Sequence, residues 1–395
     1  MKVLLVNPPS PYLDNDAAYP PMGLLYVASS FEKEGCDVKI LDMACENKFS
    51  LEDDIDLVGF TCVTPNVNRV KQLIQEVYPR HIVMVGGAHP TFMPSEEFGA
   101  HIVVQGEIES IAYQILNDIK TEKFNKSYYG GLAKSDIICK PARHLVDLHN
   151  YRPGGEHATP VYTSRGCNFN CSFCCKTAKN TYRRIHPVQV AEEIDECVNA
   201  GFKNIVIGDD NFFIDHHHAK KILEYIVDNH NIKLRINTDS RNLNKDLIEL
   251  AIAAGCFEVS MGIESGSQPI LDAMNKRTTI ERNRQAIILL KDHGISVKIY
   301  LVCNFPGETK ETIKETIDFV HQTEPNKILV SNFSPLPGCD VFNHPDKYNI
   351  EWMSDNWDDY YLVGKGGGFK PCFTTTTLSK ENQIEYHQML LDGIK

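Results

Sequence analysis

Apolar and polar positions follow two alternating periods along most of this chain. Short apolar runs stand between stretches whose apolar residues recur every three or four positions, and the longer spacing is typical of amphipathic helices. Short buried strands that alternate with helices indicate βαβ units, so we predict an α/β fold built on parallel sheets. In residues 1–130 the predicted strands are Lys2–Asn7, Val38–Asp42, Leu57–Thr61, Ile82–Gly86 and Ile102–Gln105, and the predicted helices are Pro21–Lys33 and Asn66–Val77. This pattern predicts a doubly wound, Rossmann-like domain that binds ligands at the carboxyl ends of its strands.

Residues 159–340 repeat the strand–helix alternation six times. The predicted strands are Pro160–Ser164, Asn204–Gly208, Lys233–Asn237, Phe257–Gly262, Ser296–Val302 and Lys327–Ser331. The predicted helices are Pro187–Ala200, His216–His230, Lys245–Ala254, Pro269–Met274, Glu281–His293 and Lys310–Gln322. Asp215 and Asn244 are expected N-caps, and Gly201, Gly255 and Gly294 are expected to end helices. Six βα repeats predict a partial (βα)6 barrel with its functional groups at the strand carboxyl ends.

Two segments lack this alternation. Residues 131–158 show no period and contain turn-forming Pro and Gly, which predicts a linker between the domains. Residues 341–395 form a short C-terminal extension with an aromatic cluster and a predicted helix, Ser379–Leu391. The aromatic cluster either lines the barrel cavity or docks the extension, and the sequence leaves both readings open.

Composition narrows the class of protein. The net charge of −12 argues against a nucleic-acid partner. No apolar run has the length of a membrane span, and the first residues have the pattern of a strand rather than a signal peptide. Thirteen cysteines in such a chain indicate the reducing cytoplasm, where cysteines serve metals or catalysis instead of disulfides.

Three cysteines directly after a predicted strand carry the strongest chemical signal. Cys167, Cys171 and Cys174 lie within eight positions, so all three can reach one metal centre. A structural zinc site closes with four protein ligands, and iron–sulfur clusters usually take four cysteines. A cluster held by three leaves one iron open for a small molecule. The alternative is a zinc site or a set of unrelated thiols. Cys175 is expected to be a packed thiol outside the ligand set.

The spacing C-x3-C-x2-C, with the aromatic Phe173 before the last cysteine, resembles the cluster motif of the radical S-adenosylmethionine (SAM) superfamily. The resemblance implies a 4Fe–4S cluster whose open iron binds SAM and whose reduction cleaves SAM to a 5′-deoxyadenosyl radical. It also implies SAM contacts at the strand ends of the barrel. A carboxylate suits the SAM amino group, and Arg suits its carboxylate. The expected contacts are Asp209, Asp210, Asn211, Arg241, Glu264, Ser265, Asn304 and Pro306. The alternative for each polar group is helix capping.

The first domain resembles the cobalamin-binding domain that precedes the core in one class of radical SAM enzymes. The resemblance lies in the opening Val-Asn-Pro-Pro, in Tyr19–Leu24 and in Gly86–Thr91. It implies cobalamin contacts at Pro8, Met22, Gly23, Thr61, Gly87, His89 and Glu107. The sequence lacks the Asp-x-His-x-x-Gly motif that supplies a histidine ligand to cobalt. The resemblance therefore does not by itself make His89 a cobalt ligand. The alternative is a Rossmann-like domain that kept its shape and lost the cofactor.

Together these resemblances imply a cytoplasmic, cobalamin-dependent radical SAM enzyme. The expected reaction methylates an unactivated carbon (or phosphorus) of a small molecule or peptide, with an electron donor such as flavodoxin or ferredoxin. One alternative is a radical SAM enzyme without cobalamin that catalyses dehydration, epimerisation, cyclisation or rearrangement. Another is a non-catalytic Fe–S protein. A methylthiotransferase is excluded because Cys36, Cys45 and Cys62 do not fall at the matching strand ends.

Overall fold

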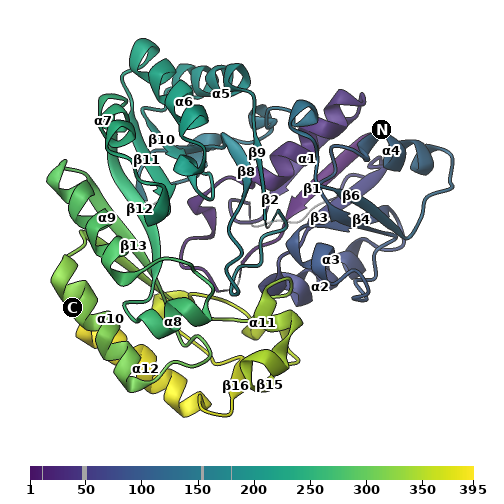
Figure 1. The fold of residues 1–395 in the computed structure, drawn as a ribbon. Coiled ribbons are helices and arrows are strands. Elements are labelled where there is room, and N and C mark those ends of the chain that lie inside the picture. Colours follow the sequence, from purple (N-terminus) through teal and green to yellow (C-terminus); the bar gives the residue numbers. More distant parts are fainter. Residues whose placement is uncertain (11, 47–50, 153–154, 179) are drawn as a thin grey trace. The chain divides into compact units, whose positions relative to one another are not determined.

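The chain forms two compact units in a computed structural model that describes residues 1–10, 12–46, 51–152, 155–178 and 180–395 (Figure 1). Unit 1 comprises Met1–His157 together with Asn356–Tyr360, and unit 2 comprises Ala158–Asp355 together with Tyr361–Lys395. Nearly all of the predicted linker, residues 131–158, therefore lies in unit 1. Two hydrogen bonds show why: Ala142 N donates to Leu25 O at 3.0 Å, and the Tyr151 hydroxyl donates to Asp42 at 2.7 Å.

Unit 1 contains a six-stranded parallel sheet in the order β2-β1-β3-β4-β5-β6. The strands are β1 (Lys2–Asn7), β2 (Asp37–Asp42), β3 (Leu57–Thr61), β4 (Ile82–Gly86), β5 (Ile102–Gly106) and β6 (Ser127–Gly131). The helices are α1 (Met22–Lys33), α2 (Val67–Val77), α3 (Ala88–Phe92) and α4 (Ala112–Lys120). The first five strands confirm the sequence prediction, and the order is one of the two common doubly wound arrangements.

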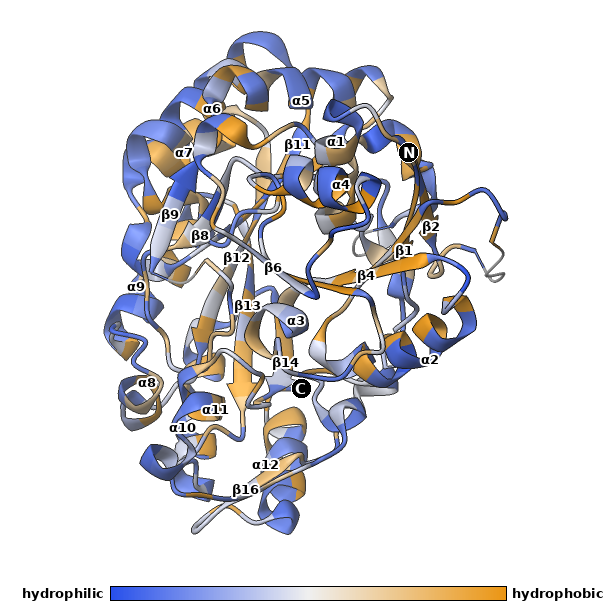
Figure 2. Ribbon diagram, turned by 90° about the vertical axis from the view of Figure 1, so that its right-hand side faces the viewer, coloured by the Kyte–Doolittle hydropathy of each residue, from blue (hydrophilic) through white to orange (hydrophobic). Residues whose placement is uncertain are grey.

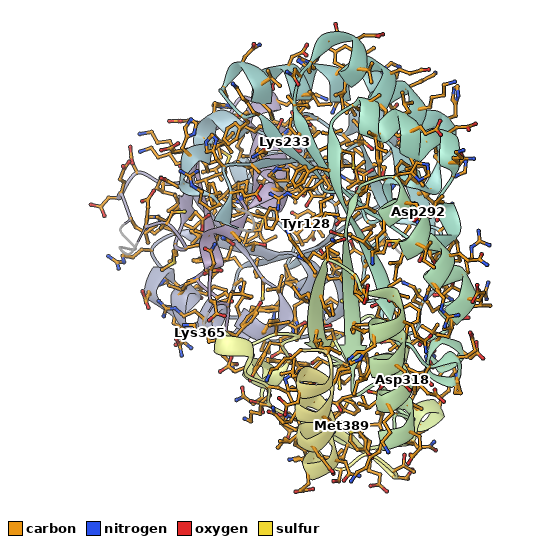
Figure 3. The ribbon with its side chains drawn as sticks, turned by 90° about the vertical axis from the view of Figure 1, so that its left-hand side faces the viewer. Tyr128, Lys233, Asp292, Asp318, Lys365 and Met389 are labelled. Atoms are coloured by element: carbon orange, nitrogen blue, oxygen red, sulfur yellow. The ribbon has the colours of Figure 1, made fainter. Side chains whose placement is uncertain are left out.

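Strand β6 was not predicted, because its residues are mostly small or polar. Tyr128, labelled in Figure 3, anchors it: the side chain is 5 % exposed, and its hydroxyl donates to Asp118 Oδ2 at 2.9 Å. Both faces of the unit 1 sheet are covered, and Figure 2 shows its strands as mainly hydrophobic. One face packs Leu5 against Phe31 of α1, and the other packs Val58 against Val70 of α2. This two-sided burial explains why the strands have continuous apolar runs.

Unit 2 contains a second six-stranded parallel sheet, in the order β14-β13-β12-β11-β10-β7. The strands are β7 (Thr159–Val161), β10 (Asn204–Ile207), β11 (Lys233–Thr238), β12 (Cys256–Glu264), β13 (Ser296–Cys303) and β14 (Lys327–Asn332). The helices between them are α5 (Pro187–Asn199), α6 (His216–Asn229), α7 (Lys245–Ala253), α8 (Gln268–Ala273), α9 (Ile280–Asp292) and α10 (Lys310–Thr323). The six predicted βα repeats are confirmed. The predicted caps are also present, since Asp215 accepts from His218 N and Asn244 from Leu247 N.

Further elements of unit 2 were not predicted. An antiparallel hairpin of β8 (Ser164–Cys167) and β9 (Thr181–Arg184) pairs Cys167 with Thr181. Gly166 has φ +87, and a Cβ there would lie 2.1 Å from Thr181 O, so only glycine fits this crossing. The last part of the chain forms α11 (Asp340–Asn343), β15 (Ile350–Met353), β16 (Phe373–Thr375) and α12 (Lys380–Gly393), of which only α12 was predicted.

Within the described ranges, the helices are all too short or too polar to cross a bilayer.

Candidate functional site

A cavity of about 330 Å³ lies at the carboxyl ends of the unit 2 strands. The three cysteines of the predicted cluster motif line it together with Phe173. The other lining residues include Asp209, Asp210 and Asn211 after β10, Asp239 after β11, Glu264 at the end of β12, and Lys276 after α8. The ends of β10, β11 and β12 therefore meet the cysteines around one space, as expected for parallel strands of a barrel.

The cysteine loop, residues 167–175, is held from three directions. It leaves the end of β8, so the hairpin fixes its first residue. Ser172 N donates to Met274 O at 2.9 Å, and Ser172 O accepts from Asp340 N at 2.9 Å. Asn275 Nδ2 donates to Asn170 O at 2.6 Å. These bonds fix the backbone that carries the thiols.

The thiols fit an iron–sulfur cluster that has one open iron. Burial raises the pKa of the Cys167 and Cys171 thiols, so binding of a metal cluster, which requires thiolates, releases protons. Among the described residues, no three His, Cys, Asp or Glu side chains are placed to hold a single metal ion. Cysteines that hold a four-iron cluster bind different irons, and they need not converge on one point. Three soft ligands around one cavity therefore suit a cluster better than a zinc ion.

Asp209 was expected to contact SAM, but its carboxylate is already engaged within the protein. It is 2 % exposed and accepts from the backbone N and the hydroxyl of Thr163 at 2.6 Å each. It also accepts from Ser164 N at 3.2 Å and Ser164 Oγ at 2.5 Å. Burial raises the pKa of Asp209 to about 6, although these donors oppose the shift. Asp209 therefore fixes the start of the β8 strand.

The side chains of Asp210 and Asn211 differ in how accessible they are to a ligand in the cavity. Asp210 faces the cavity and pairs with Lys176 at 2.7 Å, and its side chain is 32 % exposed. Asn211 is buried, donates to Asn242 Oδ1 at 2.8 Å and accepts from the Thr238 hydroxyl at 3.0 Å. Asp210 is thus the more accessible carboxylate for an ammonium group.

Arg241 was expected to hold the SAM carboxylate, and its guanidinium is instead occupied. Its Nε and Nη2 donate to the two carboxylate oxygens of Asp239, at 2.6 and 2.9 Å, which is a bidentate pair. The guanidinium carbon also lies 3.4 Å from the centroid of the Phe169 ring. Arg241 is not among the residues that line the cavity. The structure therefore assigns Arg241 to orienting Asp239.

Lys276 is the cation that sequence reasoning missed. It is 6 % exposed, lines the cavity, and lies 2.8 Å from Glu264 Oε1 and 3.4 Å from Asp239 Oδ2. Burial alone would lower the pKa of Lys276, but the two carboxylates outweigh burial and raise it. Asn275 and Arg277, on either side, both have positive φ, at 50° and 55°. This uncommon backbone conformation turns Lys276 inward. The sequence did not predict this position of Lys276, because no apolar period indicates it.

Glu264 and Ser265, adjacent in sequence, have different environments. Glu264 lines the cavity at the end of β12, with φ 67. Ser265 is fully buried, and its hydroxyl contacts Thr316 Oγ1 at 3.1 Å and accepts from Ser267 N at 3.1 Å. Ser265 therefore shapes the turn before α8.

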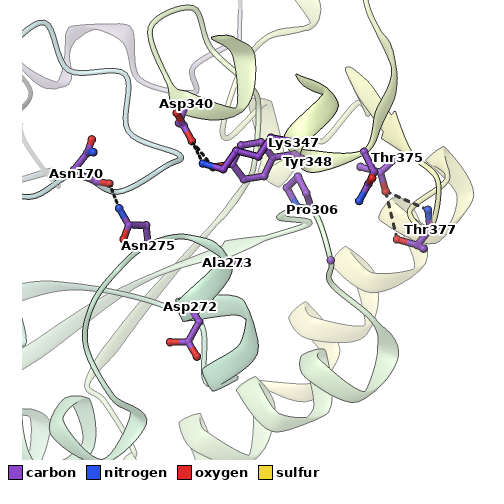
Figure 4. Close-up of a pocket in the computed structure, with 12 residues that line it drawn as sticks. Asn170, Asp272, Ala273, Asn275, Pro306, Asp340, Lys347, Tyr348, Thr375 and Thr377 are labelled. Atoms are coloured by element: carbon purple, nitrogen blue, oxygen red, sulfur yellow. Dashed lines mark hydrogen bonds and ion pairs between the residues drawn. The ribbon is translucent and has the colours of Figure 1, made fainter. Parts of the chain in front are cut away.

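Asn304 and Pro306 lie apart from the cysteine cavity. Asn304 is fully buried, and its Nδ2 donates to Asn332 Oδ1 at 2.8 Å and to Gln383 O at 3.1 Å, which ties β13 to β14 and α12. Pro306 lines a second cavity of about 620 Å³, shown in Figure 4. Dashed lines there mark the bonds Asn170–Asn275, Asp340–Lys347 and Thr375–Thr377. The cysteine loop contributes Asn170 to this second cavity.

The predicted cobalamin contacts gather around the carboxyl edge of the unit 1 sheet. Strand order reverses between β1 and β3, and such a switch point opens a crevice at the carboxyl ends. Pro8 follows β1 and is buried, and Thr61 ends β3. Elsewhere, Met22 is buried at the start of α1, Gly23 has open space around it, and Glu107 Oε2 accepts from Ala133 N at 2.8 Å.

Gly87 has a structural task of its own. Its φ is +117, and a Cβ there would lie 2.6 Å from Cys62 O. The glycine thus lets the loop after β4 approach the loop after β3.

His89 is enclosed by unit 1. It is 0 % exposed, its Nδ1 lies 3.1 Å from Thr64 Oγ1, and its ring lies 4.7 Å from that of Trp357. Burial lowers the pKa of His89 to about 4, so the ring is neutral at physiological pH. An imidazole buried in this way is not presented to a bound corrin, so the edge suits a cofactor held by backbone and shape.

Two family models match the chain. The model of the radical SAM superfamily matches residues 161–320, and the model of the B12 binding domain matches residues 16–116. The chain is therefore a radical SAM enzyme that also carries a B12-binding domain. This architecture implies a 4Fe–4S cluster, SAM and cobalamin as its cofactors, as the sequence predicted.

Matches to individual relatives extend over most of the chain. It is 28 % identical to the anaerobic magnesium-protoporphyrin IX monomethyl ester cyclase of Rubrivivax gelatinosus, over 87 % of this chain and 69 % of the relative. It is 27 % identical to an uncharacterized methyltransferase of Pyrococcus horikoshii, and that match covers 96 % of this chain and 90 % of the relative. The structure of the radical SAM methyltransferase TsrM from Kitasatospora setae, with cobalamin and a [4Fe-4S] cluster bound, matches with a TM-score of 0.76 and 18 % identity. That match covers 100 % of this chain and 89 % of TsrM, and it confirms the predicted fold.

Proposed function

We propose that this chain is a cobalamin-dependent radical SAM methyltransferase, acting on an unactivated carbon (or phosphorus) of a small molecule or peptide. The observation that carries the proposal is the set of three thiols around one cavity, in a chain that also has a B12-binding domain. The Pyrococcus relative and TsrM are both described as methyltransferases, which supports methyl transfer.

The residues of the cavity divide the work of holding SAM. Asp210 is the accessible carboxylate for the amino group of SAM. Glu264 offers an oxygen to the ribose hydroxyls. When bound, the cluster and SAM would supply a radical that removes hydrogen from substrate, and methylcobalamin would carry the methyl group. The remaining task of the protein is to orient substrate and exclude water.

Unit 1 is proposed to hold cobalamin at the switch point between β1 and β3, near Pro8 and Thr61. Because His89 is buried, it would not supply an imidazole to the cobalt of a bound cobalamin. An electron donor such as flavodoxin or ferredoxin reduces the cluster. The cytoplasm is the proposed location, because it keeps the thirteen cysteines reduced.

Anaerobic reconstitution with iron, sulfide and hydroxocobalamin tests the proposal. The wild-type protein should retain iron and cobalt and, with a reductant, consume SAM. Cys167→Ala, Cys171→Ala and Cys174→Ala should each lose most of the iron and the visible thiolate-to-iron absorption, yet keep cobalt. Cys175→Ala is the matched control, since Cys175 is not among the cavity-lining residues, and it should keep both metals. Full iron content in a variant without the first three cysteines would contradict the cluster assignment.

A second candidate function is radical chemistry without methyl transfer, such as cyclisation. The Rubrivivax relative, which is described as a cyclase, favours it. The cobalt content of the protein and the products of the reaction distinguish the two candidate functions. Wild-type protein that cleaves SAM but retains no cobalt would exclude the methyltransferase and leave the second candidate.

A further inference from the structure

The inner face of the unit 2 sheet carries a lysine next to the cysteine cavity. In the register of the sheet, Asn237 of β11 pairs with Ser260 of β12, and Ser260 pairs with Lys298 of β13. Asn237 and Ser260 both line the cavity. Alternate residues of a strand share one face, and Val297, beside Lys298, is fully buried on the other face. Lys298 is partly exposed and therefore lies on the inner face, in the same row as two cavity-lining residues.

The Lys298 ammonium lies beside Tyr300, a residue that lines the cavity. Its Nζ lies 5.1 Å from the centroid of the Tyr300 ring. Tyr300 is the next inward residue toward the carboxyl end of β13, roughly 6.6 Å further along the strand. The ammonium is thus directed up the strand, toward the end where the cysteine loop stands.

The other lysines, those that line this cavity, pair with carboxylates of the protein. Lys176 pairs with Asp210 at 2.7 Å, and Lys276 pairs with Glu264 at 2.8 Å. Lys327, the register partner of Lys298 on β14, pairs with Glu258 at 2.6 Å. In the described part of the chain, Lys298 has no carboxylate within ion-pair distance. A partly buried ammonium without a counter-ion favours an anionic ligand.

Neutral donors stand beside this ammonium. The hydroxyls of Ser260 and Tyr300 line the same cavity, and neither makes a hydrogen bond with another described residue. A lysine with adjacent hydroxyl donors is a suitable arrangement for a carboxylate or a phosphoryl group, both of which accept several hydrogen bonds.

We propose that the substrate carries a carboxylate or phosphoryl anion that pairs with Lys298, with Ser260 and Tyr300 as neutral donors. The inference rests on the proposed function, because it assigns the substrate class of that cavity. The anion is bound on the Lys298 row, and the rest of the substrate extends toward the cysteine loop at the carboxyl ends. Neutral substrates lack the group that this position recognises.

Binding of four small probes to the cluster-reconstituted protein tests the proposal. Propionate and methylphosphonate are the anions, and propionamide and dimethyl methylphosphonate are their neutral counterparts. Titrations followed by ligand NMR under anaerobic conditions should show binding of at least one anion and of neither neutral probe. The anion that binds more tightly identifies the source as a carboxylate or a phosphoryl group. Lys298→Met should weaken anion binding at least about tenfold, and Lys298→Arg should retain most of it.

Lys233→Met is the matched control. Lys233, labelled in Figure 3, lies on β11 of the same sheet with its Nζ 5.9 Å from the Phe257 ring centroid, but it is exposed and, unlike Tyr300, Phe257 does not line the cavity. Its loss should leave anion binding unchanged. Equal binding of neutral and anionic probes, unchanged affinity in Lys298→Met, or no anion binding by the wild-type protein each overturns the inference. Iron, cobalt and SAM cleavage are measured on the same samples, so failure of the proposed function is seen separately.

Discussion

At the scale of single residues, Lys276 compensates buried negative charge in the cysteine cavity. It is the cation between two nearly buried carboxylates, Asp239 and Glu264. Removing one member of a buried ionic group leaves the others uncompensated, which costs more than the group contributes as a whole. Stability therefore depends on this side chain.

We expect Lys276→Met to lower the free energy of unfolding by about 3 kcal/mol, because it leaves the buried carboxylate of Glu264 without its cation. Denaturant titration of the reduced apoprotein measures the change. Lys245→Met removes a lysine from an exposed pair with Glu249 and should leave stability nearly unchanged. Adding Glu264→Gln to Lys276→Met should restore part of the loss. Equal stability of the two single lysine variants would show that the buried group is not coupled in this way.

At the scale of elements, the loop after β4 depends on Gly87. Alanine there would combine a left-handed backbone with a contact of 2.6 Å to Cys62 O. We expect Gly87→Ala to destabilise the protein by about 2 kcal/mol, measured by denaturant titration. Gly23→Ala, in the first turn of α1 with no atom within 4 Å, should be neutral or slightly stabilising. If Gly87→Ala is as stable as Gly23→Ala, the close approach is not maintained in solution.

The turn between β13 and α10 predicts a pH dependence. Burial raises the pKa of Glu308 from 4.5 to about 8, although backbone donors at Asn304 and Phe305 oppose the shift. The folded protein then binds this proton more tightly than the unfolded chain does. The contribution of Glu308 to stability is therefore fully present below about pH 4.5 and falls as the pH rises toward 8.

Glu308→Gln removes this titration. The stability of the wild-type protein minus that of Glu308→Gln should decrease by a few kcal/mol between pH 5 and 8, on the order of the pKa shift. Chemical denaturation at several pH values measures the difference. A difference that stays constant or grows with pH would contradict the burial of an ionisable carboxyl at this turn.

At the scale of the whole molecule, a short piece of the C-terminal extension belongs to unit 1. Trp357 lies over His89, and Tyr360 packs against Trp357 with ring centroids 5.2 Å apart. We expect Trp357→Ala to lower the free energy of unfolding by about 2 kcal/mol, because it opens a void over a neutral, buried imidazole. Trp352→Ala is the control, since Trp352 is 38 % exposed and stacks only with Lys380 among the contacts described. Equal effects of the two substitutions would argue against the docking of this segment.

The amino-acid sequence alone predicts most of the strands and main helices and the cluster motif. Period and capping residues located nearly all of the sheet strands and the main helices, because these signals depend on residues a few positions apart. The spacing of Cys167, Cys171 and Cys174 is equally local, and so is the alternation that indicates two parallel sheets. In unit 1 the sequence prediction missed β6, whose small and polar residues carry no period, and the helices α3 and α4.

The availability of the charged groups and the packing of the C-terminal segments depend on tertiary contacts that the sequence does not reveal. Arg241 is occupied by Asp239, Lys276 points inward, and Asp209 is saturated by Thr163 and Ser164. The β8–β9 hairpin and the docking of Trp357 likewise join distant parts of the chain. Such pairings depend on how strands align in three dimensions, so residue type and local spacing name the candidate groups but not their partners.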